Sequence, residues 1–592
     1  MDSCSTFKSC GKAEKKLEEQ DFCRKTRNRI VVISISMVLL ISLIVGIAVG
    51  VSPPGRRSTG SGENPPSYSA DYTSISSMCN VTLYPNSCFS SISSVGGSSN
   101  VPAHLNLEGV FKLSLQVALG ELVNVSSLPR RLMSSTDNYN VSFNSSDPLT
   151  VQALHDCGTL FDHAIGQVKH CIAWIEADLE VGNSPFPDTD SIRTWLSTAI
   201  TDQKTCQYGL MEARNGSELA DFMKMAMKNS MEFTSNSLAI AWHVLALLGN
   251  LRIPSTRKLL TAKEPKSAEW ISKFDWRLML AGNPKPDLIV AKDDSGNFST
   301  ISEALASVPK RTSARTVIYI KKGVYVENVT VGADLWNVMM YGDGMRKTVI
   351  SGSKNYVDGT PTYSSATFGA DGKGFIAKDI GFENTAGPEK FQAVALRSSA
   401  DQSVFYRCFF DAYQDTLFTH AGRQFYRDCL IIGTIDFIFG NSAAVFQNCR
   451  IQPRQPMPGQ FNGITAQGKS DPNQNTGISI QHCQIRPFDN LTAQTFLGRP
   501  WEDYSTTVYM RSDIDGFINP MGWAQWIPNL DPPSTIFYAE YQNTGPGSEI
   551  RGRVSWAGFR HNISEKQAVQ FSVESFIQGN KWLPKANVLY DL

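Results

Sequence analysis

An aromatic–polar–cysteine phrase that recurs at a nearly constant interval constrains the fold of this chain more than any other feature. FYRC ends at Cys408, FYRDC ends at Cys429 and FQNC ends at Cys449. Short apolar runs with period-two alternation and breaks at Gly or Asn surround the phrase. A repeat of about 20–22 residues is typical of a solenoid of stacked coils, and its regularity favours a parallel β-helix over a sandwich. Residues one period apart should then lie about 4.8 Å apart on one face.

Four polar residues follow the same period. Gln392 and Gln414 are separated by about one period, and so are Asp415 and Asp436. We expect their side chains to converge, which would place two carboxyl groups and two amides together. One carboxylate could act as a nucleophile and the other as an acid and base, while amide donors receive an oxyanion. The same residue types also end coils and satisfy backbone groups, so spacing alone leaves both interpretations open.

Five short motifs occur in the order found in plant pectin methylesterases, which the chain resembles from Asp287 to its C-terminus. The motifs are GVYVE at 323–327, QAVAL at 392–396, QDTL at 414–417, DFIFG at 436–440 and LGRPW at 497–501. The resemblance implies a right-handed parallel β-helix. It also implies an enzyme that removes methyl esters from polygalacturonan, the backbone of pectin.

The resemblance also implies catalytic roles. Asp436 would be the nucleophile that attacks the ester carbonyl. Asp415 would protonate the departing methanol and then activate water. Gln392 and Gln414 would hold the oxyanion, and Arg499 would pair with Asp436 and keep it ionised and oriented.

Two further residues would bind substrate by the same resemblance. Trp501 would offer a flat apolar face to a sugar ring, and Thr362 occupies a position that contacts substrate in the family. Thr362 lies in PTYSSATF, which departs from the family's commoner TTF-like form. The reaction needs no cofactor and no metal.

Four cysteines of the repeat region should stack, and their spacing does not choose between pairs. The resemblance implies disulfides Cys408–Cys429 and Cys449–Cys483.

Residues 71–250 are predicted to form a small bundle of four amphipathic helices, and the polar stretch at 134–147 is predicted to be a loop. One predicted helix carries apolar residues at helical spacing, namely Val151, Leu154, Phe161, Ile165, Val168, Ile172 and Ile175. His155, His163 and His170 have no evident fourth ligand, so we interpret them as ordinary helix residues rather than a metal site.

This helical region is similar to the inhibitor-like pro-region that precedes many plant pectin methylesterases. LYPNSC at 83–88 matches the opening motif of that family. The resemblance implies disulfides Cys79–Cys88 and Cys157–Cys206, and it leaves Cys171 as a buried thiol. The pro-region is therefore expected to be autoinhibitory.

The N-terminal part predicts membrane insertion. Residues 30–51 form an apolar run without a charge that is long enough to span a bilayer, and a basic flank precedes it. We predict a cytosolic tail at 1–29, a transmembrane signal anchor at 30–51 and a flexible stalk at 52–70. A cleaved signal peptide is the alternative.

Between the helical region and the β-helix domain at 285–592 lies a linker at 251–284. Its motifs RKLL (257–260) and WRLM (276–279) are candidate sites for a subtilisin-like protease, and RKLL is the better match. RRLM (130–133) lies inside the bundle region and is expected to stay uncut. Processing would release a membrane-anchored precursor as an enzyme secreted to the cell wall.

Nine N-x-S/T sequons follow the apolar segment and agree with a secreted glycoprotein. Their asparagines are Asn80, Asn124, Asn140, Asn144, Asn215, Asn297, Asn328, Asn490 and Asn562.

Composition and motifs also exclude some functions. The chain has 55 Lys+Arg and 55 Asp+Glu, which gives no electrostatic case for nucleic acid. No G-x-S-x-G elbow of a serine esterase occurs. A pectin-cleaving glycosidase or a pure inhibitor remain as alternatives, and release of methanol against reducing ends separates them. Expected partners are methylated pectin, the processing protease and separate pectin methylesterase inhibitor proteins.

Overall fold

The computed structural model describes residues 75–96, 107–134, 146–181, 189–213, 216–245, 283–586 and 588–591. The predicted tail, signal anchor and stalk, and the motifs RKLL and WRLM, lie outside the described residues. Of the helices within these ranges, none combines the length and the apolar character that a membrane crossing requires.

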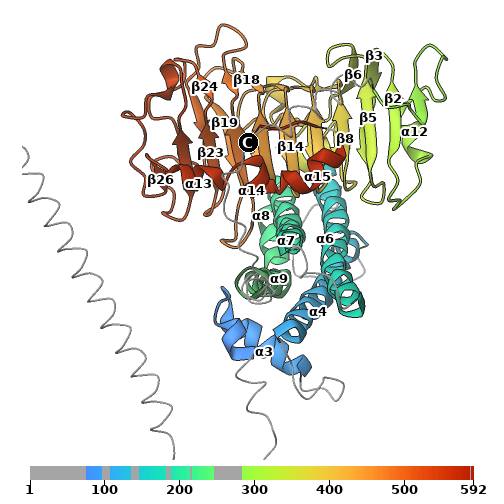
Figure 1. Cartoon of the computed structure of the whole chain (residues 1–592), viewed down its shortest axis with the longest axis vertical. Helices are drawn as coiled ribbons and strands as arrows, with labels where there is room; N and C mark the ends of the chain where they lie inside the picture. The colour runs from blue at the N-terminus through green and yellow to red at the C-terminus, as the bar shows by residue number, and fades with distance from the viewer. Residues whose placement is uncertain are drawn as a thin grey trace, which may run out of the picture. The chain divides into compact units, whose positions relative to one another are not determined.

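Three parallel sheets make up the C-terminal part, and from β2 to β24 successive strands enter the three sheets in turn (Figure 1). The 11-stranded sheet has the order β1 (Leu288–Val290), β2 (Thr316–Ile320), β5 (Val338–Gly342), β8 (Ile376–Lys378), β11 (Ser403–Tyr406), β14 (Arg423–Arg427), β17 (Ala443–Gln447), β20 (Gly477–Gln481), β23 (Thr506–Met510), β25 (Phe537–Tyr541) and β26 (Phe559–Arg560).

The other two sheets have seven and eight strands. The 7-stranded sheet has the order β22 (Thr495–Gly498), β19 (Asn462–Gln467), β16 (Ile438–Gly440), β13 (Leu417–Thr419), β10 (Leu396–Ser398), β7 (Phe368–Ala370) and β4 (Val329–Val331). The 8-stranded sheet has the order β24 (Asp513–Ile514), β21 (Gln484–Ile485), β18 (Arg450–Pro453), β15 (Leu430–Gly433), β12 (Phe409–Asp411), β9 (Gly381–Asn384), β6 (Thr348–Gly352) and β3 (Gly323–Val326).

The recurring aromatic phrase builds the interior of the coils. Phe405, Tyr426 and Phe446 are register partners in β11, β14 and β17. Their rings stack, with centroids 4.8 Å and 4.4 Å apart, and all three are fully buried. The interval at which the phrase recurs in the sequence is therefore the length of one coil, as predicted.

The cysteine ladder corrects one prediction. Cys408, Cys429, Cys449 and Cys483 each precede a strand of the 8-stranded sheet by one residue and occupy the same position in successive coils. All four are buried free thiols, so the expected disulfides Cys408–Cys429 and Cys449–Cys483 are wrong for this structure. Each thiol instead donates to a backbone carbonyl of its own coil and to one of the preceding coil, which satisfies it without a covalent bond.

Four helices of the N-terminal part pack in a ring around one apolar core: α4 (Leu107–Ser126), α6 (Pro148–Val181), α7 (Thr189–Glu212) and α9 (Lys228–Ile240). The shorter elements are α3 (Pro85–Gly96), α5 (Leu128–Met133), α8 (Gly216–Ala226) and η1 (Ala241–Leu245). Of the apolar positions predicted for α6, Leu154, Phe161, Val168 and Ile175 are buried, whereas Val151 is exposed.

Two predicted disulfides are present in the bundle. Cys79 bonds to Cys88, and Cys157 of α6 bonds to Cys206 of α7. Cys171 is a buried free thiol, as expected. The motif RRLM lies in α5, where Leu132 is buried, so a protease could not bind it as an extended strand.

Short C-terminal helices cover the 11-stranded sheet (Figure 1). They are α13 (Glu565–Val569), α14 (Val573–Ile577) and α15 (Gly579–Ala586), and α12 (Ile301–Ala306) lies near the first strands. Three 3-10 turns complete the described elements: η2 (Thr362–Ser365), η3 (Pro388–Lys390) and η4 (Pro546–Ser548).

Six sequon asparagines lie in the described ranges, and all six are exposed. They are Asn80, Asn124, Asn297, Asn328, Asn490 and Asn562. Their exposure is compatible with the predicted glycosylation.

Candidate functional site

The seven polar and aromatic residues predicted for the site line one cavity of about 360 Å³. They are Thr362, Gln392, Gln414, Asp415, Asp436, Arg499 and Trp501. They come from segments as far apart in sequence as η2 and the end of β22, so the stacking of coils brings them together.

The register of the 7-stranded sheet places the two aspartates. Leu417 of β13 pairs with Ile438 of β16, and each aspartate lies two residues before its strand. Asp415 and Asp436 have positive φ values of 64° and 51°, which residues other than glycine seldom adopt. They therefore turn the chain at the same corner of successive coils, and the two carboxyl groups face one cavity.

Arg499 holds Asp436 with both arms of its guanidinium group. Its Nε lies 2.9 Å from Oδ1, and its Nη2 lies 2.6 Å from Oδ2. The guanidinium also lies over the ring of Trp526, 4.3 Å from the centroid. This fork fixes the orientation of the Asp436 carboxylate and compensates its charge inside the protein.

Asp415 has a different environment from Asp436. Burial raises the pKa of Asp415 well above its ordinary value, and the charges of Asp436 and Glu212 raise it further, while Arg499 opposes them. No salt bridge in the described chain pairs it with a cation. One carboxyl group thus lies where its protonated form is favoured, beside one that is ion-paired, which is the pattern expected for an acid and a nucleophile.

Aromatic rings line the other side of the cavity. The ring of Trp501 lies 6.2 Å from that of Trp526 and 6.3 Å from that of Phe439. Phe418 stacks on Phe439 with centroids 4.3 Å apart. Such a surface suits the apolar face of a sugar.

The sequence analysis missed one wall of the cavity, which belongs to helix α7. Thr205, Tyr208, Gly209, Met211 and Glu212 line it. These positions follow helical spacing, but no motif marks them, so the sequence predicts a helix face without naming what the face contacts.

Two α7 residues reach the predicted substrate-binding groups. The Tyr208 ring lies 4.7 Å from that of Trp501, and a carboxylate oxygen of Glu212 accepts from the Thr362 backbone N–H at 2.8 Å. Burial raises the pKa of Glu212 to about 7, against the hydrogen bond from the Thr362 backbone N–H, which lowers it.

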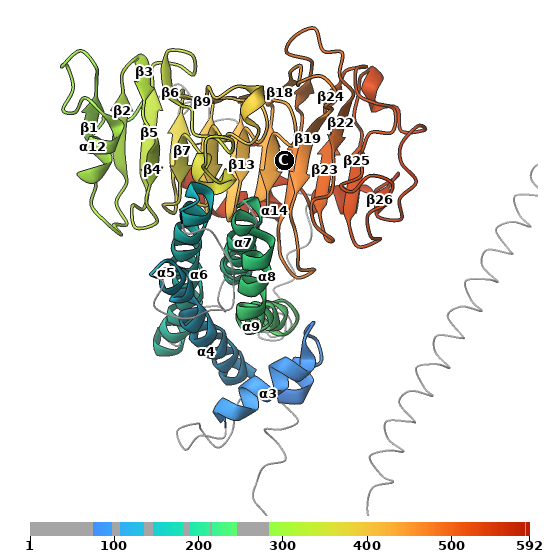
Figure 2. The same ribbon diagram turned by 180° about the vertical axis from the view of Figure 1, so that it is seen from behind.

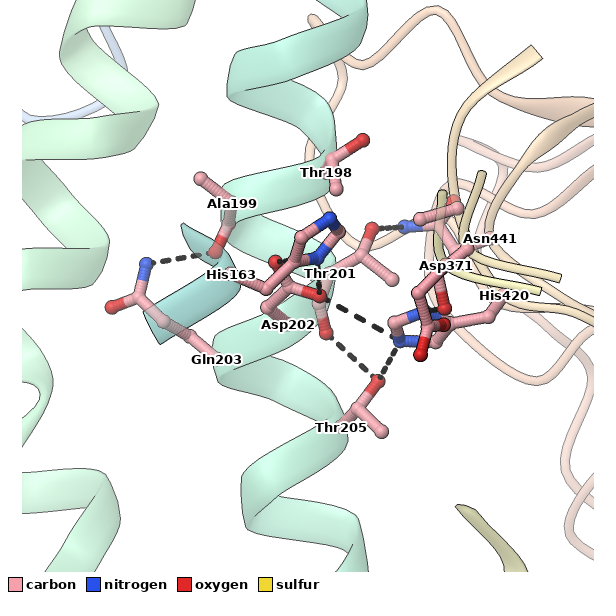
Figure 3. A network of polar contacts seen from close by, with 12 residues as sticks. His163, Thr198, Ala199, Thr201, Asp202, Gln203, Thr205, Asp371, His420 and Asn441 are labelled. Atoms are coloured by element: carbon pink, nitrogen blue, oxygen red, sulfur yellow. Dashed lines mark hydrogen bonds and ion pairs between the residues drawn. The ribbon is translucent and has the colours of Figure 1, made fainter. Parts of the chain in front are cut away.

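A row of polar contacts continues along α7 toward its N-terminus (Figure 3). Thr205 Oγ1 and His420 Nε2 lie 2.9 Å apart, and Asn441 Nδ2 donates to Thr201 Oγ1 at 2.9 Å. Asn475 Nδ2 donates to Thr194 Oγ1, also at 2.9 Å. The described helical and β-helical parts belong to one compact unit, and Figure 2 shows α6 and α7 reaching the β-helix near β7 and β13.

Two of the three histidines singled out in the bundle have structural partners. His163 Nδ1 lies 3.2 Å from a carboxylate oxygen of Asp202, and the His170 ring contacts Trp195. Within the described ranges, no cluster of three or more His, Cys, Asp or Glu residues could hold a metal ion.

Comparison with known proteins identifies both parts. A family model described as Pectinesterase matches residues 287–580, and one described as plant invertase/pectin methylesterase inhibitor matches residues 73–240. Pectinesterase 3 of Phaseolus vulgaris is 47% identical over 100% of both chains. Probable pectinesterase/pectinesterase inhibitor 46 of Arabidopsis thaliana is 44% identical over 96% of each. Among solved structures, pectin methylesterase from carrot is 49% identical with a TM-score of 0.51, covering 53% of this chain and 99% of its own.

Proposed function

The chain belongs to the pectinesterase family, whose action on methylated pectin it shares, and we propose that Asp436 is its nucleophile and Asp415 its acid and base. The observation that carries this assignment is the unequal environment of the two carboxyl groups. Arg499 grips Asp436 with two short hydrogen bonds, whereas Asp415 is buried with a raised pKa. The ion pair favours the ionised form that a nucleophile needs at Asp436, and burial favours the protonated form that an acid needs at Asp415.

In the first step, an oxygen of Asp436 attacks the carbonyl carbon of a galacturonate methyl ester. The carbonyl oxygen becomes an oxyanion, which the side-chain amides of Gln392 and Gln414 would receive from the wall of the cavity. The bond to the methoxy oxygen then breaks, and Asp415 gives its proton to that oxygen. Methanol leaves, and an anhydride joins the sugar carboxyl to Asp436.

In the second step, water attacks the anhydride. Asp415, now a carboxylate, takes one proton from the water, and the bond to Asp436 breaks. The products are a free galacturonate carboxyl group and a regenerated Asp436 carboxylate, and Asp415 has regained its proton. One ester and one water yield one acid and one methanol.

We also propose that the helical bundle lowers activity while it is attached. Helix α7 forms a wall of the catalytic cavity, with Tyr208 against Trp501 and Glu212 against Thr362. Being part of the same chain gives the bundle a high effective concentration at the cavity. The chain would travel the secretory pathway as a glycosylated, anchored precursor, be cut in the linker at 251–284 and act in the cell wall.

Asp436→Asn tests the assignment. The amide is nearly the same size and keeps the packing, but it cannot form the anhydride, so methanol release should be abolished while the melting temperature stays close to that of the wild type. Asp294→Asn serves as the control, because it makes the same change at an exposed aspartate that also has a positive φ, of 60°. Substantial turnover in Asp436→Asn would show that another group is the nucleophile, and release of reducing ends would favour a glycosidase.

A further inference from the structure

Helix α7 places two side chains where the proposed reaction requires a galacturonate residue. The backbone N–H of Thr362 donates a hydrogen bond to Glu212, with 2.8 Å between the nitrogen and Oε2. Thr362 is 7% exposed, and its hydroxyl faces the same carboxyl group. This hydroxyl has no hydrogen-bond partner within the described chain. A backbone N–H and a hydroxyl that both face one carboxyl group form a site that can hold a carboxyl group by hydrogen bonds.

Glu212 is an unusual choice for a contact that only holds two domains together. The groups around its carboxyl are neutral or acidic. Thr362 donates a hydrogen bond to it, the charge of Asp156 raises its pKa, and its own charge raises the pKa of Asp415. Within the described residues it forms no salt bridge. Burying a carboxyl group beside two others without a cation is costly.

The cleft must nevertheless accept such a group during its own reaction. Each turnover leaves a free galacturonate carboxyl beside Asp415 and Asp436, and the next sugars of de-esterified pectin carry the same group. The carboxyl group of Glu212 lines the same cavity as Asp415 and Asp436, so it is surrounded by the groups that would surround the carboxyl group of the product.

Tyr208 extends the likeness to a sugar ring. Its ring lies 4.7 Å from that of Trp501 at 37°, and its buried hydroxyl has no hydrogen-bond partner within the described chain. A flat ring with an unpaired hydroxyl thus covers the aromatic face that would receive a sugar. Tyr208 and Glu212 are four residues apart on α7, so one helix face presents a ring and a carboxyl group together.

From this juxtaposition we propose that Glu212 and Tyr208 hold α7 in the cleft as a mimic of unesterified polygalacturonan, and that de-esterified pectin displaces the bundle. This inference rests on the proposed function, because the mimicked ligand is its product. The consequence is relief of autoinhibition by product: a region of pectin that has already been de-esterified opens the enzyme bound to it.

Displacement is tested on the full chain by hydrogen–deuterium exchange, with a short unesterified galacturonate oligomer as the probe. The oligomer should raise exchange at 205–213 and lower it at 361–366. A galactose oligomer of the same length lacks the carboxyl groups, so it should need an about tenfold higher concentration for the same effect.

A matched pair of variants then isolates the carboxyl group. Glu212→Ala should lower the oligomer concentration for half-maximal opening by about tenfold. Glu218→Ala removes an exposed carboxyl group from neighbouring helix α8 and should behave like the wild type. Glu212→Met keeps the length of the side chain without a carboxyl group, and it replaces Glu212→Ala should the alanine variant lose its cooperative melting transition.

The proposal is overturned if the oligomer protects 361–366 without raising exchange at 205–213. It is also overturned if galactose oligomers act equally well, or if Glu212→Ala and Glu218→Ala need the same oligomer concentration. The oligomer carries no ester, so displacement is measured without turnover. Its outcome is therefore distinguishable from that of the Asp436→Asn test.

Discussion

Two helical segments lie against the β-helix, and their contact surfaces differ in kind. The C-terminal helices α14 and α15 cover the 11-stranded sheet with apolar side chains, which pack against apolar residues of the strands. This cluster includes Val404, Phe425, Val445, Val573, Ile577, Trp582 and Leu583, all nearly or fully buried. Helix α7 meets the β-helix largely through hydroxyl, amide and imidazole groups, such as those of Thr201, Thr205, Asn441 and His420.

The difference indicates which contact belongs to the fold and which can open. Exposing apolar surface to water costs free energy in proportion to its area, so a segment held in this way stays in place. Hydrogen bonds between neutral groups contribute little net free energy, because water replaces the partners when the surfaces part. The bundle is therefore suited to leave the cleft, whereas α14 and α15 are not.

The largest effect is expected at the apolar contact. Trp582 is 6% exposed, and its Nε1 donates to the Ile577 carbonyl at 2.8 Å. Trp582→Ala should lower the free energy of unfolding by about 3–5 kcal/mol because it removes a large buried side chain. Thermal melting followed by circular dichroism measures this loss.

Trp242→Ala is the matched control, because the Trp242 ring is exposed and contacts mainly the Arg193 guanidinium, 3.7 Å away. It should cost about 1 kcal/mol or less. Equal melting temperatures for the two alanine variants would refute the view that α15 is part of the fold.

The second effect concerns pH at the polar contact. The pKa of Glu212 rises from 4.5 to about 7 in the closed arrangement, mainly through burial. The closed arrangement favours the protonated form of Glu212, so this form stabilises closure fully below pH 4.5. The stabilisation is lost as the pH rises from 4.5 to about 7, the pKa of Glu212 in the closed arrangement. The loss amounts to at most about 3 kcal/mol. Glu212→Gln stays neutral and should remove it.

His420 acts in the opposite direction. Burial and the charges of Arg397 and His163 hold its pKa well below the ordinary value of 6.5. Arg397 belongs to the β-helix and acts in both states, so only burial under α7 and the charge of His163 in α6 weaken closure as pH falls below 6.5. The measurement is methanol release by the full chain divided by that of residues 283–592, which cancels the pH dependence of catalysis. The carrot enzyme, which matches only 53% of this chain, supports independent folding of that segment. The wild type and Glu212→Gln should differ in how this ratio changes between about pH 5 and 8. The same change in both would refute the role of Glu212 in the pH dependence of closure.

The sequence was informative about the β-helix because its period carries both fold and site. Asp415 and Asp436 are one coil apart, and the register of β13 and β16 turns that spacing into proximity. The polar face of α7 gave no comparable signal. Threonines at helical spacing look the same whether they face water or another domain, so Glu212 could not be assigned without the fold. The four stacked cysteines occupy the same position in successive coils, so their spacing could not show whether they form disulfides or remain free thiols.

A smaller effect is expected from one hydrogen bond of the α7 contact. Thr205→Val keeps the shape of the side chain but leaves buried His420 Nε2 without its partner at 2.9 Å. Closure should weaken by about 1–3 kcal/mol. Methanol release by the full chain should therefore rise several-fold, while release by residues 283–592 cannot change, because Thr205 lies outside them. A full chain with valine at 205 that is no more active than the wild type would mean that the contact does not limit opening.

The smallest effect is expected at the partly exposed ion pair between Lys204 of α7 and Glu502. Their charged atoms are 3.9 Å apart, with side chains 29% and 19% exposed. Such a pair contributes about 0.2–1 kcal/mol, so Lys204→Ala should raise methanol release by the full chain by less than about fivefold. The increase should disappear at about 1 M salt, where screening acts within about 3 Å. Lys224→Ala removes an exposed charge from α8 and should change nothing at either salt concentration. An increase with Lys204→Ala that persists in salt would mean that Lys204 holds the bundle by packing of its alkyl chain, and the contact would then be less polar than its hydrogen bonds indicate.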